Sequence, residues 1–173
     1  LASGAATNLW SIARPTVPST TINEMAFGQD ISGVSDHRWE SPDLAVGSGA
    51  LSLTFQHRYD FEKSGGQNWD GAVIEYSEDG GMNWADVNTL AGVNPGYNGT
   101  ISTQASNPLA GRSGYTGATA NFATGAMVNR TLNFGTTLAN KTVKLRFRIG
   151  TDEMQGAGGW YIDNMAFTGL TNK

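Results

Sequence analysis

The last two candidate strands constrain the fold of this chain more than any other feature. Residues 142–149 and 159–167 both alternate between large and small, or apolar and charged, side chains. This period of two is typical of β-strands. Asp163 lies in the middle of the second segment, and burying an acid is costly unless a partner neutralises it. We therefore expect a partner for Asp163, and a metal ion is the best candidate.

The remaining composition also favours an all-β protein. The 173 residues include 23 glycines, and only 15% of the residues are charged. Such a profile is typical of a turn-rich β structure, and the length suits one well-buried domain. Residues 1–30, rich in Ala, Ser, Thr and Pro toward their start, are expected to form an N-terminal arm or an incomplete first strand. Residues 31–173 are expected to form the β domain.

Several classes of function are disfavoured by charge and composition. A net charge of −4 argues against a nucleic-acid partner, which requires a basic face. No apolar run approaches the roughly 20 residues of a membrane span, so membrane insertion is not expected. The chain has no cysteine, whereas eukaryotic secreted domains usually carry disulfides. We therefore predict a secreted, extracellular bacterial protein.

The clearest strand covers residues 51–61. One of its faces is apolar except for His57, which is therefore expected to be a core histidine. The other members of that face are Leu51, Leu53, Phe55, Tyr59 and Phe61. Residues 88–125 form a long irregular segment with many turn residues, and a segment of this kind usually carries function or covers part of the domain.

Residues 77–84 fit the pattern Ser-x-Asp-x-Gly-x-x-Trp, known as the Asp-box turn. Asp79 can accept turn N–H groups, Gly81 can adopt a positive φ, and Trp84 can pack beneath the hairpin. The pattern predicts a hairpin and carries almost no information about activity.

Six carboxylates fall near predicted strand ends and form the candidate metal site. Calcium binds several oxygen ligands in irregular geometry, which suits such positions, whereas zinc would favour His or Cys. The alternative is that these acids are solvated or paired with Arg58, Arg146 and Arg148. The six acids are Asp60, Glu62, Asp70, Asp152, Glu153 and Asp163.

An enzymatic function is not predicted. Glu62 and Glu75 could be considered as a glycosidase acid/base pair, but Glu75 is equally consistent with a solvated outward position. No common hydrolase or phosphate-binding motif is visible. Several aromatic residues could stack on sugar rings, although each is also explained by core or turn packing: Trp69, Trp84, Tyr97, Tyr115 and Trp160.

Four sequence blocks, in this order, resemble the MAM-like jelly-roll modules of secreted bacterial proteins. The blocks are residues 51–62, 69–84, 141–149 and 159–164. Such modules include the C-terminal parts of immune inhibitor A-type and fungalysin-type metalloproteases and, more distantly, the cleaved-adhesin modules of gingipains. The resemblance covers about residues 36–170.

The resemblance implies a two-sheet antiparallel jelly-roll β-sandwich with no catalytic centre and a structural calcium ion. By position, Glu62, Asp70 and Asp163 match the family's acidic residues, and Asp60 is a weaker fourth ligand. Trp10 and Asp30 are faint counterparts of the family's upstream strand, so no N-terminal ligand is assigned.

The expected function is that of a non-catalytic, calcium-stabilised accessory or binding module, within a secreted protein such as a protease. It would direct an attached catalytic domain to a cell-surface glycan or an extracellular protein, with Trp69, Tyr97, Tyr115 and Trp160 as candidate ligand contacts. The alternative is a structural or assembly module that packs against the neighbouring catalytic domain. A β-sandwich glycoside hydrolase or lyase is a third, less favoured reading.

Overall fold

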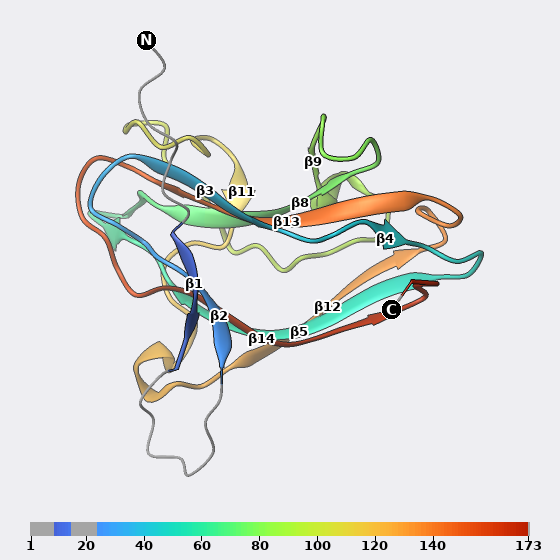
Figure 1. The fold of residues 1–173 in the computed structure, drawn as a ribbon. Helices are drawn as coiled ribbons and strands as arrows, with labels where there is room; N and C mark the ends of the chain where they lie inside the picture. Colours follow the sequence, from blue (N-terminus) through green and yellow to red (C-terminus); the bar gives the residue numbers. More distant parts are fainter. Residues whose placement is uncertain (1–8, 15–23, 173) are drawn as a thin grey trace.

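The computed structural model describes residues 9–14 and 24–172, which form two antiparallel β-sheets packed face to face (Figure 1). The lower sheet in this view has the strand order β1-β2-β14-β5-β12. Its strands are β1 (Trp10–Ala13), β2 (Met25–Gly28), β14 (Gly159–Thr168), β5 (Leu51–Asp60) and β12 (Val128–Gly135).

The upper sheet has the order β3-β13-β8-β9, and β4 pairs with the opposite end of β13. Its strands are β3 (Ser35–Glu40), β4 (Leu44–Ala45), β13 (Thr142–Thr151), β8 (Gly71–Ser77) and β9 (Ala85–Asp86). From β5 onward, the long strands alternate between the two sheets along the chain. The predicted antiparallel β-sandwich is confirmed, while its jelly-roll connectivity stays a prediction.

The short elements lie in the connections between these strands. Two small ribbons pair β6 with β7 and β10 with β11, and two 3₁₀ turns complete the structure. Their bounds are Lys63–Ser64, Gln67–Asn68, Gly99–Thr100, Ser113–Gly114, Val87–Thr89 and Phe122–Thr124. The described part of the chain contains no helix of the length and apolarity that crossing a bilayer would require.

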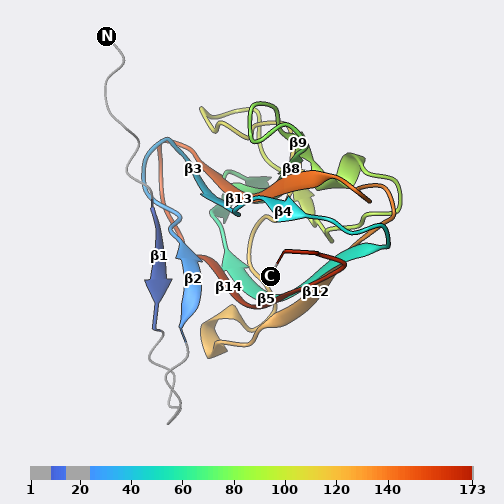
Figure 2. The ribbon, with the colours of Figure 1, turned by 45° about the vertical axis from the view of Figure 1, so that its right-hand side comes forward.

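The two sheets face each other as two layers (Figure 2). The main core fills the space between them. The predicted apolar face of β5 points into it, and His57 is fully buried there. The Trp160 indole donates a hydrogen bond to His57 Nδ1 at 3.1 Å. Burial, with a further contribution from the Arg130 cation, lowers the pKa of His57 to about 3, so this side chain is a neutral core histidine as predicted.

Residues 88–125 cover the outer face of β8. Val73 on this face is fully buried together with Ile101 and Leu109 of the long segment. Tyr115 reaches through to the main core, and its hydroxyl donates to the Pro95 carbonyl at 2.5 Å. Because both faces of β8 are covered, five consecutive residues of this strand are buried, Gly71–Glu75. The expectation that the long segment covers part of the domain is confirmed.

The Asp-box turn has the predicted local structure. Asp79 accepts the Asn83 N–H at 2.9 Å, and Gly81 has a φ of 98°. The Trp84 indole donates to the Gly81 carbonyl at 2.8 Å. The guanidinium carbon of Arg146 lies over the Trp84 ring, 4.2 Å from the centroid of that ring. This cation–π contact holds the hairpin against the outer face of β13.

The N-terminal region contributes more to the fold than the sequence suggested. β1 and β2 form a hairpin, and β2 also pairs with β14, so both strands belong to the lower sheet. Neither β2 nor β3 was expected from the sequence pattern. The remaining part of the expected N-terminal arm, residues 1–8 and 15–23, lies outside the described residues, as does residue 173.

Candidate metal centre

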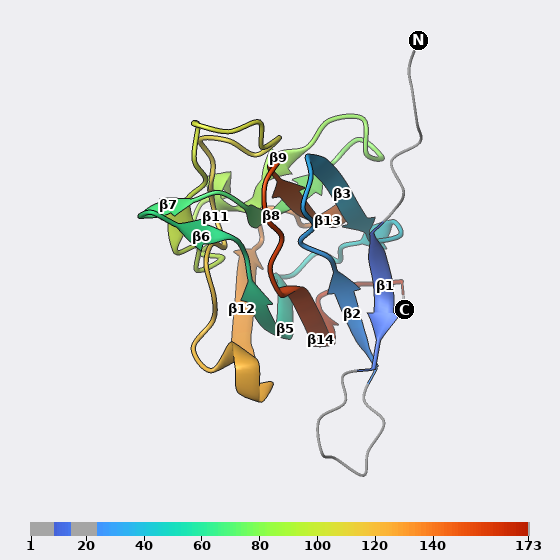
Figure 3. The same cartoon turned by 90° about the vertical axis from the view of Figure 1, so that its left-hand side faces the viewer.

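Four acidic residues meet at one end of the sandwich, which Figure 3 views from the front. Asp30 follows β2, Glu62 follows β5, Asp70 precedes β8 and Asp152 follows β13. Each therefore lies in a different connection, and two of the four strands belong to each sheet. These residues are called the acid cluster below.

Backbone hydrogen bonds hold one oxygen of each carboxylate. Asp30 Oδ2 accepts the Glu62 N–H at 3.0 Å, and Asp70 Oδ1 accepts the Asp152 N–H at 2.7 Å. Asp152 Oδ1 accepts the Met154 N–H at 2.7 Å. Glu62 Oε2 accepts the Gln155 N–H at 3.2 Å. The acids thus tie the four connections together and cannot turn freely toward solvent.

The second oxygens of three of these carboxylates are buried and have no hydrogen-bond partner. They are Asp30 Oδ1, Asp70 Oδ2 and Asp152 Oδ2. Ligand oxygens of Glu62, Asp70 and Asp152 lie within 4.8 Å of one another. Asp30 is not one of these three, but its carboxyl group faces that of Asp70 at hydrogen-bonding range. Since a buried charged oxygen without a partner costs several kcal/mol, this arrangement requires protons or a cation.

The electrostatics of the cluster lead to the same requirement. Burial raises the pKa of Asp70 well above its usual range, and the facing Asp30 carboxyl raises it further. The pKa of Asp30 is also raised, mainly by burial. Without a cation the two carboxyl groups would share a proton, because two adjacent buried carboxylates repel each other. A divalent cation would instead stabilise both as anions.

Close backbone packing holds the Asp152 connection against Asp30. A Cβ on Gly156 would lie only 2.3 Å from the Asp30 carbonyl oxygen, so the two backbones touch at a position that admits no side chain. The Asn107 amide adds a further brace, donating to the Trp69 carbonyl at 2.9 Å and to the Gly150 carbonyl at 2.8 Å. The cluster is therefore a built feature of the fold.

The structure brings together two of the four predicted metal ligands, Glu62 and Asp70. Asp60 is the last residue of β5, where it pairs with Gly159, and it is not a member of the group. Asp163 lies farther along β14, opposite Gln56, and is half-buried. The expectation that Asp163 is a buried core acid is wrong. Ile162 points into the core, and the next residue along a strand points to the opposite face.

Sequence reasoning missed Asp30 and did not select Asp152 as a ligand. Both lie in connections, where no periodicity marks a side chain's direction. The alternative of arginine pairing does not apply to the cluster: within the described part of the chain, none of the ion pairs involves its four acids.

The arginines instead form a separate network on the outer face of the upper sheet. Glu75 is buried and accepts hydrogen bonds from Arg112 at 2.5 Å, Arg148 at 3.3 Å and the Nε of Arg146. Arg148 also pairs with Asp36 through two bonds of 2.7 and 2.9 Å. Burial alone would raise the pKa of Glu75, but the Arg146 and Arg112 hydrogen bonds outweigh it and lower the pKa.

This network separates the two residues considered as a glycosidase pair. Glu75 lies in the middle of β8 among three guanidinium groups, and it is not the solvated outward residue that the sequence allowed. Glu62 lies in the acid cluster beyond the end of β5.

The four aromatic ligand candidates fall into two groups. Trp160 and Tyr115 are fully buried in the main core and present no ring face to a ligand, so their assignment as ligand contacts is corrected. Trp69 is half-buried beside the acid cluster, and its indole N–H donates to Ser64 at 2.9 Å. Tyr97 belongs to the long segment and is half-buried, with its hydroxyl on the backbone of β8.

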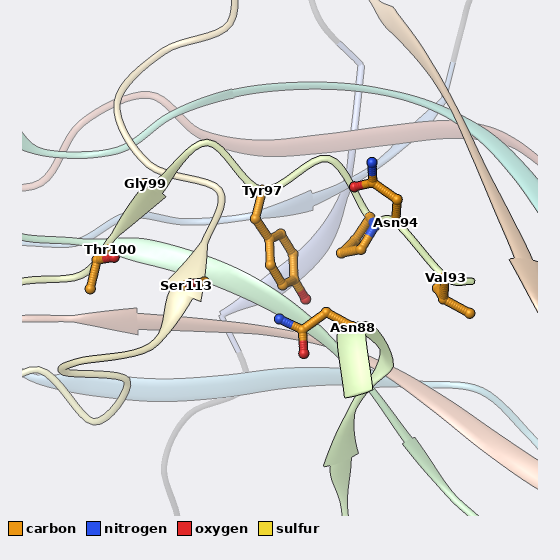
Figure 4. A pocket seen from close by; sticks show the side chains of 8 residues that line it. Asn88, Val93, Asn94, Tyr97, Gly99, Thr100 and Ser113 are labelled. Atoms are coloured by element: carbon orange, nitrogen blue, oxygen red, sulfur yellow. The ribbon is translucent and has the colours of Figure 1, made fainter. Parts of the chain in front are cut away.

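Tyr97 lines a pocket of about 330 Å³ between the segment 88–100 and β11 (Figure 4). Its hydroxyl accepts the Ile74 N–H at 2.8 Å and donates to Asp86 at 3.0 Å. The other lining side chains are Asn88, Val93, Asn94, Pro95, Thr100 and Ser113. Since the phenol is already committed to the framework and no lining residue is charged, this pocket carries less chemistry than the acid cluster.

Comparison of the chain with protein-family models and with curated proteins gives no match.

Proposed function

We propose that the chain is a calcium-stabilised, non-catalytic binding module of a secreted bacterial protein. The observation that supports it best is the set of three buried, unpartnered carboxylate oxygens in the acid cluster. The ion would be held by Asp30, Glu62, Asp70 and Asp152. It would neutralise their charges and so link the four connections that carry them. Because the donors are all oxygens in an irregular arrangement, calcium fits better than zinc, or than magnesium with its strict octahedral demand.

The cation test compares divalent metals on the intact chain. Thermal unfolding is measured in EGTA, in calcium and in magnesium, together with calorimetric titration of each metal into metal-free protein. A ligand that binds only the folded state raises its stability by mass action, by about 2.7 kcal/mol at a hundredfold excess over Kd. We expect calcium to raise the melting temperature far more than magnesium. Identical melting curves in EGTA and calcium would refute the site.

The module would direct an attached catalytic domain, such as a protease, to a cell-surface glycan or an extracellular protein. The resemblance of its four sequence blocks to MAM-like accessory modules supports this role, as does the half-buried Trp69 beside the cluster. The test is binding of the folded, calcium-loaded chain to a panel of cell-wall polysaccharides and matrix proteins. Retention on none of them would count against a targeting role.

A second candidate function is assembly with a neighbouring domain. An apolar groove of about 270 Å³ lies between the β3–β4 side of the upper sheet and the end of β14. Its apolar lining consists of Trp39, Pro42, Leu44, Leu145, Phe147, Met165 and Phe167. Sedimentation of the isolated chain tests this role. We expect concentration-dependent association that Met165→Ser weakens, and a strictly monomeric chain would contradict it.

A further inference from the structure

A pocket of about 280 Å³ opens directly onto the acid cluster. Two cluster residues, Glu62 and Asp152, line this pocket. Asp70 is fully buried behind them and Asp30 nearly so, and neither lines it. The pocket is therefore the side from which a cation held by the cluster can be reached. The other lining residues are Ser64, Trp69, Gln104, Ala105, Glu153 and Met154.

The cluster alone does not fill the coordination of calcium. Calcium takes about 6–8 oxygen ligands. Three unpartnered aspartate oxygens and the Glu62 carboxylate supply about four of them, or a few more if some bind through both oxygens. Oxygens that enter through the pocket can fill remaining positions, because Glu62 and Asp152 border it. Asp152 belongs to the acid cluster and also lines the pocket. Its Oδ2 is buried and has no hydrogen-bond partner.

Trp69 adds an aromatic side chain to the lining of the pocket. Trp69 is half-buried, and the hydrogen bond from its indole N–H to Ser64 holds the ring in place. The Glu153 carboxylate is also held, because its Oε2 accepts the Ser106 N–H at 3.0 Å. A ligand in this pocket therefore meets both a fixed aromatic side chain and acidic residues.

The charge of the pocket selects the class of ligand. Four carboxylates around one divalent cation leave a net negative charge, and Glu153 adds to it. Carboxylated or phosphorylated ligands are therefore repelled. An ammonium group would be attracted by the acids but cannot ligate a cation. Neutral hydroxyl oxygens are not repelled by the acids and can also ligate the cation. Two hydroxyl groups on adjacent carbons can replace two water molecules at once.

We propose that this pocket binds a neutral sugar, whose adjacent hydroxyl groups complete the calcium coordination while the C–H face of its ring packs on Trp69. The inference rests on the proposed calcium site and names the ligand class of that site. It assigns to Trp69 a binding role that the core residues Tyr115 and Trp160 cannot have.

Terbium luminescence tests the proposal directly. Tb³⁺ replaces calcium in oxygen sites, and its lifetimes in H₂O and D₂O count the water molecules bound to the ion. The probes are methyl α-mannoside, methyl β-galactoside and methyl β-xyloside as neutral sugars, with glucuronate and a lysine amide as charged comparisons. We expect the number of bound waters to fall by about two with at least one neutral sugar, because a diol replaces two of the ligands.

Variants separate the pocket from the metal site. Trp69→Leu and, independently, Ala105→Phe, which fills the pocket, should abolish the response to sugar. Both should leave the rise in melting temperature with calcium intact. Terbium is excited directly in these variants, so that loss of the indole does not affect the signal. Tyr97→Phe, in the other pocket, is the matched control and should retain the full response.

The outcomes distinguish the two proposals. If calcium stabilises the protein but no neutral sugar displaces water, the sugar site is wrong and the calcium site stands. Preferential binding of glucuronate or of the lysine amide would also overturn the sugar site. If neither calcium nor terbium binds, the proposed function falls as well.

Discussion

The acid cluster and the arginine network both contain buried carboxylates, and they differ in what neutralises them. Glu75 lies among three guanidinium groups, and its pKa is lowered. Asp70 has no cationic side chain beside it within the described residues, and burial raises its pKa. Burial is thus common to both sites, and the partner decides the sign of the shift. A buried acid therefore indicates a metal only where no arginine pairs with it.

The largest effect is expected from a substitution that breaks the arginine network. Arg146→Met removes a buried partner of Glu75 and should lower the free energy of unfolding by about 3 kcal/mol, because it leaves a buried charge under-compensated. Urea denaturation measures the loss. The double variant Glu75→Gln/Arg146→Met should recover most of it. If the single and double variants are equally unstable, lost packing on Trp84 is the cause and the ion pair is not.

The second prediction is that one variant of the acid cluster has opposite effects on stability with and without calcium. Asp70→Asn should remove the calcium-dependent stabilisation, about 2.7 kcal/mol at a hundredfold excess of calcium over Kd. In EGTA the same variant should be at least as stable as the parent chain, because it removes a buried carboxyl with a raised pKa. Calorimetric melting in both buffers checks this. A variant less stable than the parent in EGTA would show that Asp70 is held by the protein alone.

The third prediction concerns pH. Burial and the Asp30 carboxyl raise the pKa of Asp70 to about 9, so in EGTA the folded protein holds a proton that the unfolded chain has lost above pH 4. Its contribution to stability is present at low pH and is lost as pH rises through about 9. Between pH 7 and 9 the loss should be of the order of 2 kcal/mol.

Calcium should reverse this trend, because it binds the deprotonated carboxylates. Urea unfolding at pH 7 and pH 9, with calcium or with EGTA, makes the comparison. The two buried histidines do not interfere in this window, because their pKa values are lowered to about 4 and about 3. The same pH slope in both buffers would contradict a cation at Asp70.

A smaller effect is expected from the backbone that carries Asp152. Gly156→Ala places a methyl group against the Asp30 carbonyl and should lower the free energy of unfolding by roughly 1–2 kcal/mol. It should also weaken calcium binding, since the two connections must separate. Gly49→Ala is the matched control, because a Cβ there meets nothing within 4 Å. If the two substitutions change calcium affinity equally, the contact between Gly156 and Asp30 does not support the metal site.

The smallest expected effect sharpens the boundary of the acid cluster. Asp163→Asn should leave both the calcium response and the melting temperature nearly unchanged, because Asp163 lies on the outward face of β14. Calcium titration calorimetry of this variant beside Asp70→Asn provides the comparison. A lost calcium response in Asp163→Asn would restore the ligand assignment suggested by the sequence.

The strands that alternate most regularly were predictable from the sequence. In β5 the period of two places Leu53, Phe55 and His57 on one face, and all three are buried. The same reasoning applied to β14 would have placed Asp163 opposite Trp160 and Ile162, and therefore outside the core. That signal was present in the sequence. The expectation of a buried Asp163 rested on its place in the middle of a largely apolar strand and did not apply this alternation.

Half of the acid cluster could not be predicted in this way. Glu62 and Asp70 follow and precede strongly patterned strands, so their position at the sheet end was accessible. Asp30 follows the four-residue β2, whose sequence carries too little alternation to identify it as a strand. Asp152 was a candidate by type only, because nothing in a connection's sequence states which way its side chain points.

The all-β class, the inward face of β5 and the Asp-box hairpin follow from the amino-acid sequence, because they depend on residues close along the chain. The tertiary structure alone decided which acids face one another and which face arginines. Asp30 and Asp152 are 122 residues apart in the sequence, and Glu75 meets Arg146 across neighbouring strands. Such partnerships depend on how the two sheets are joined and closed at their ends, and no local pattern encodes that.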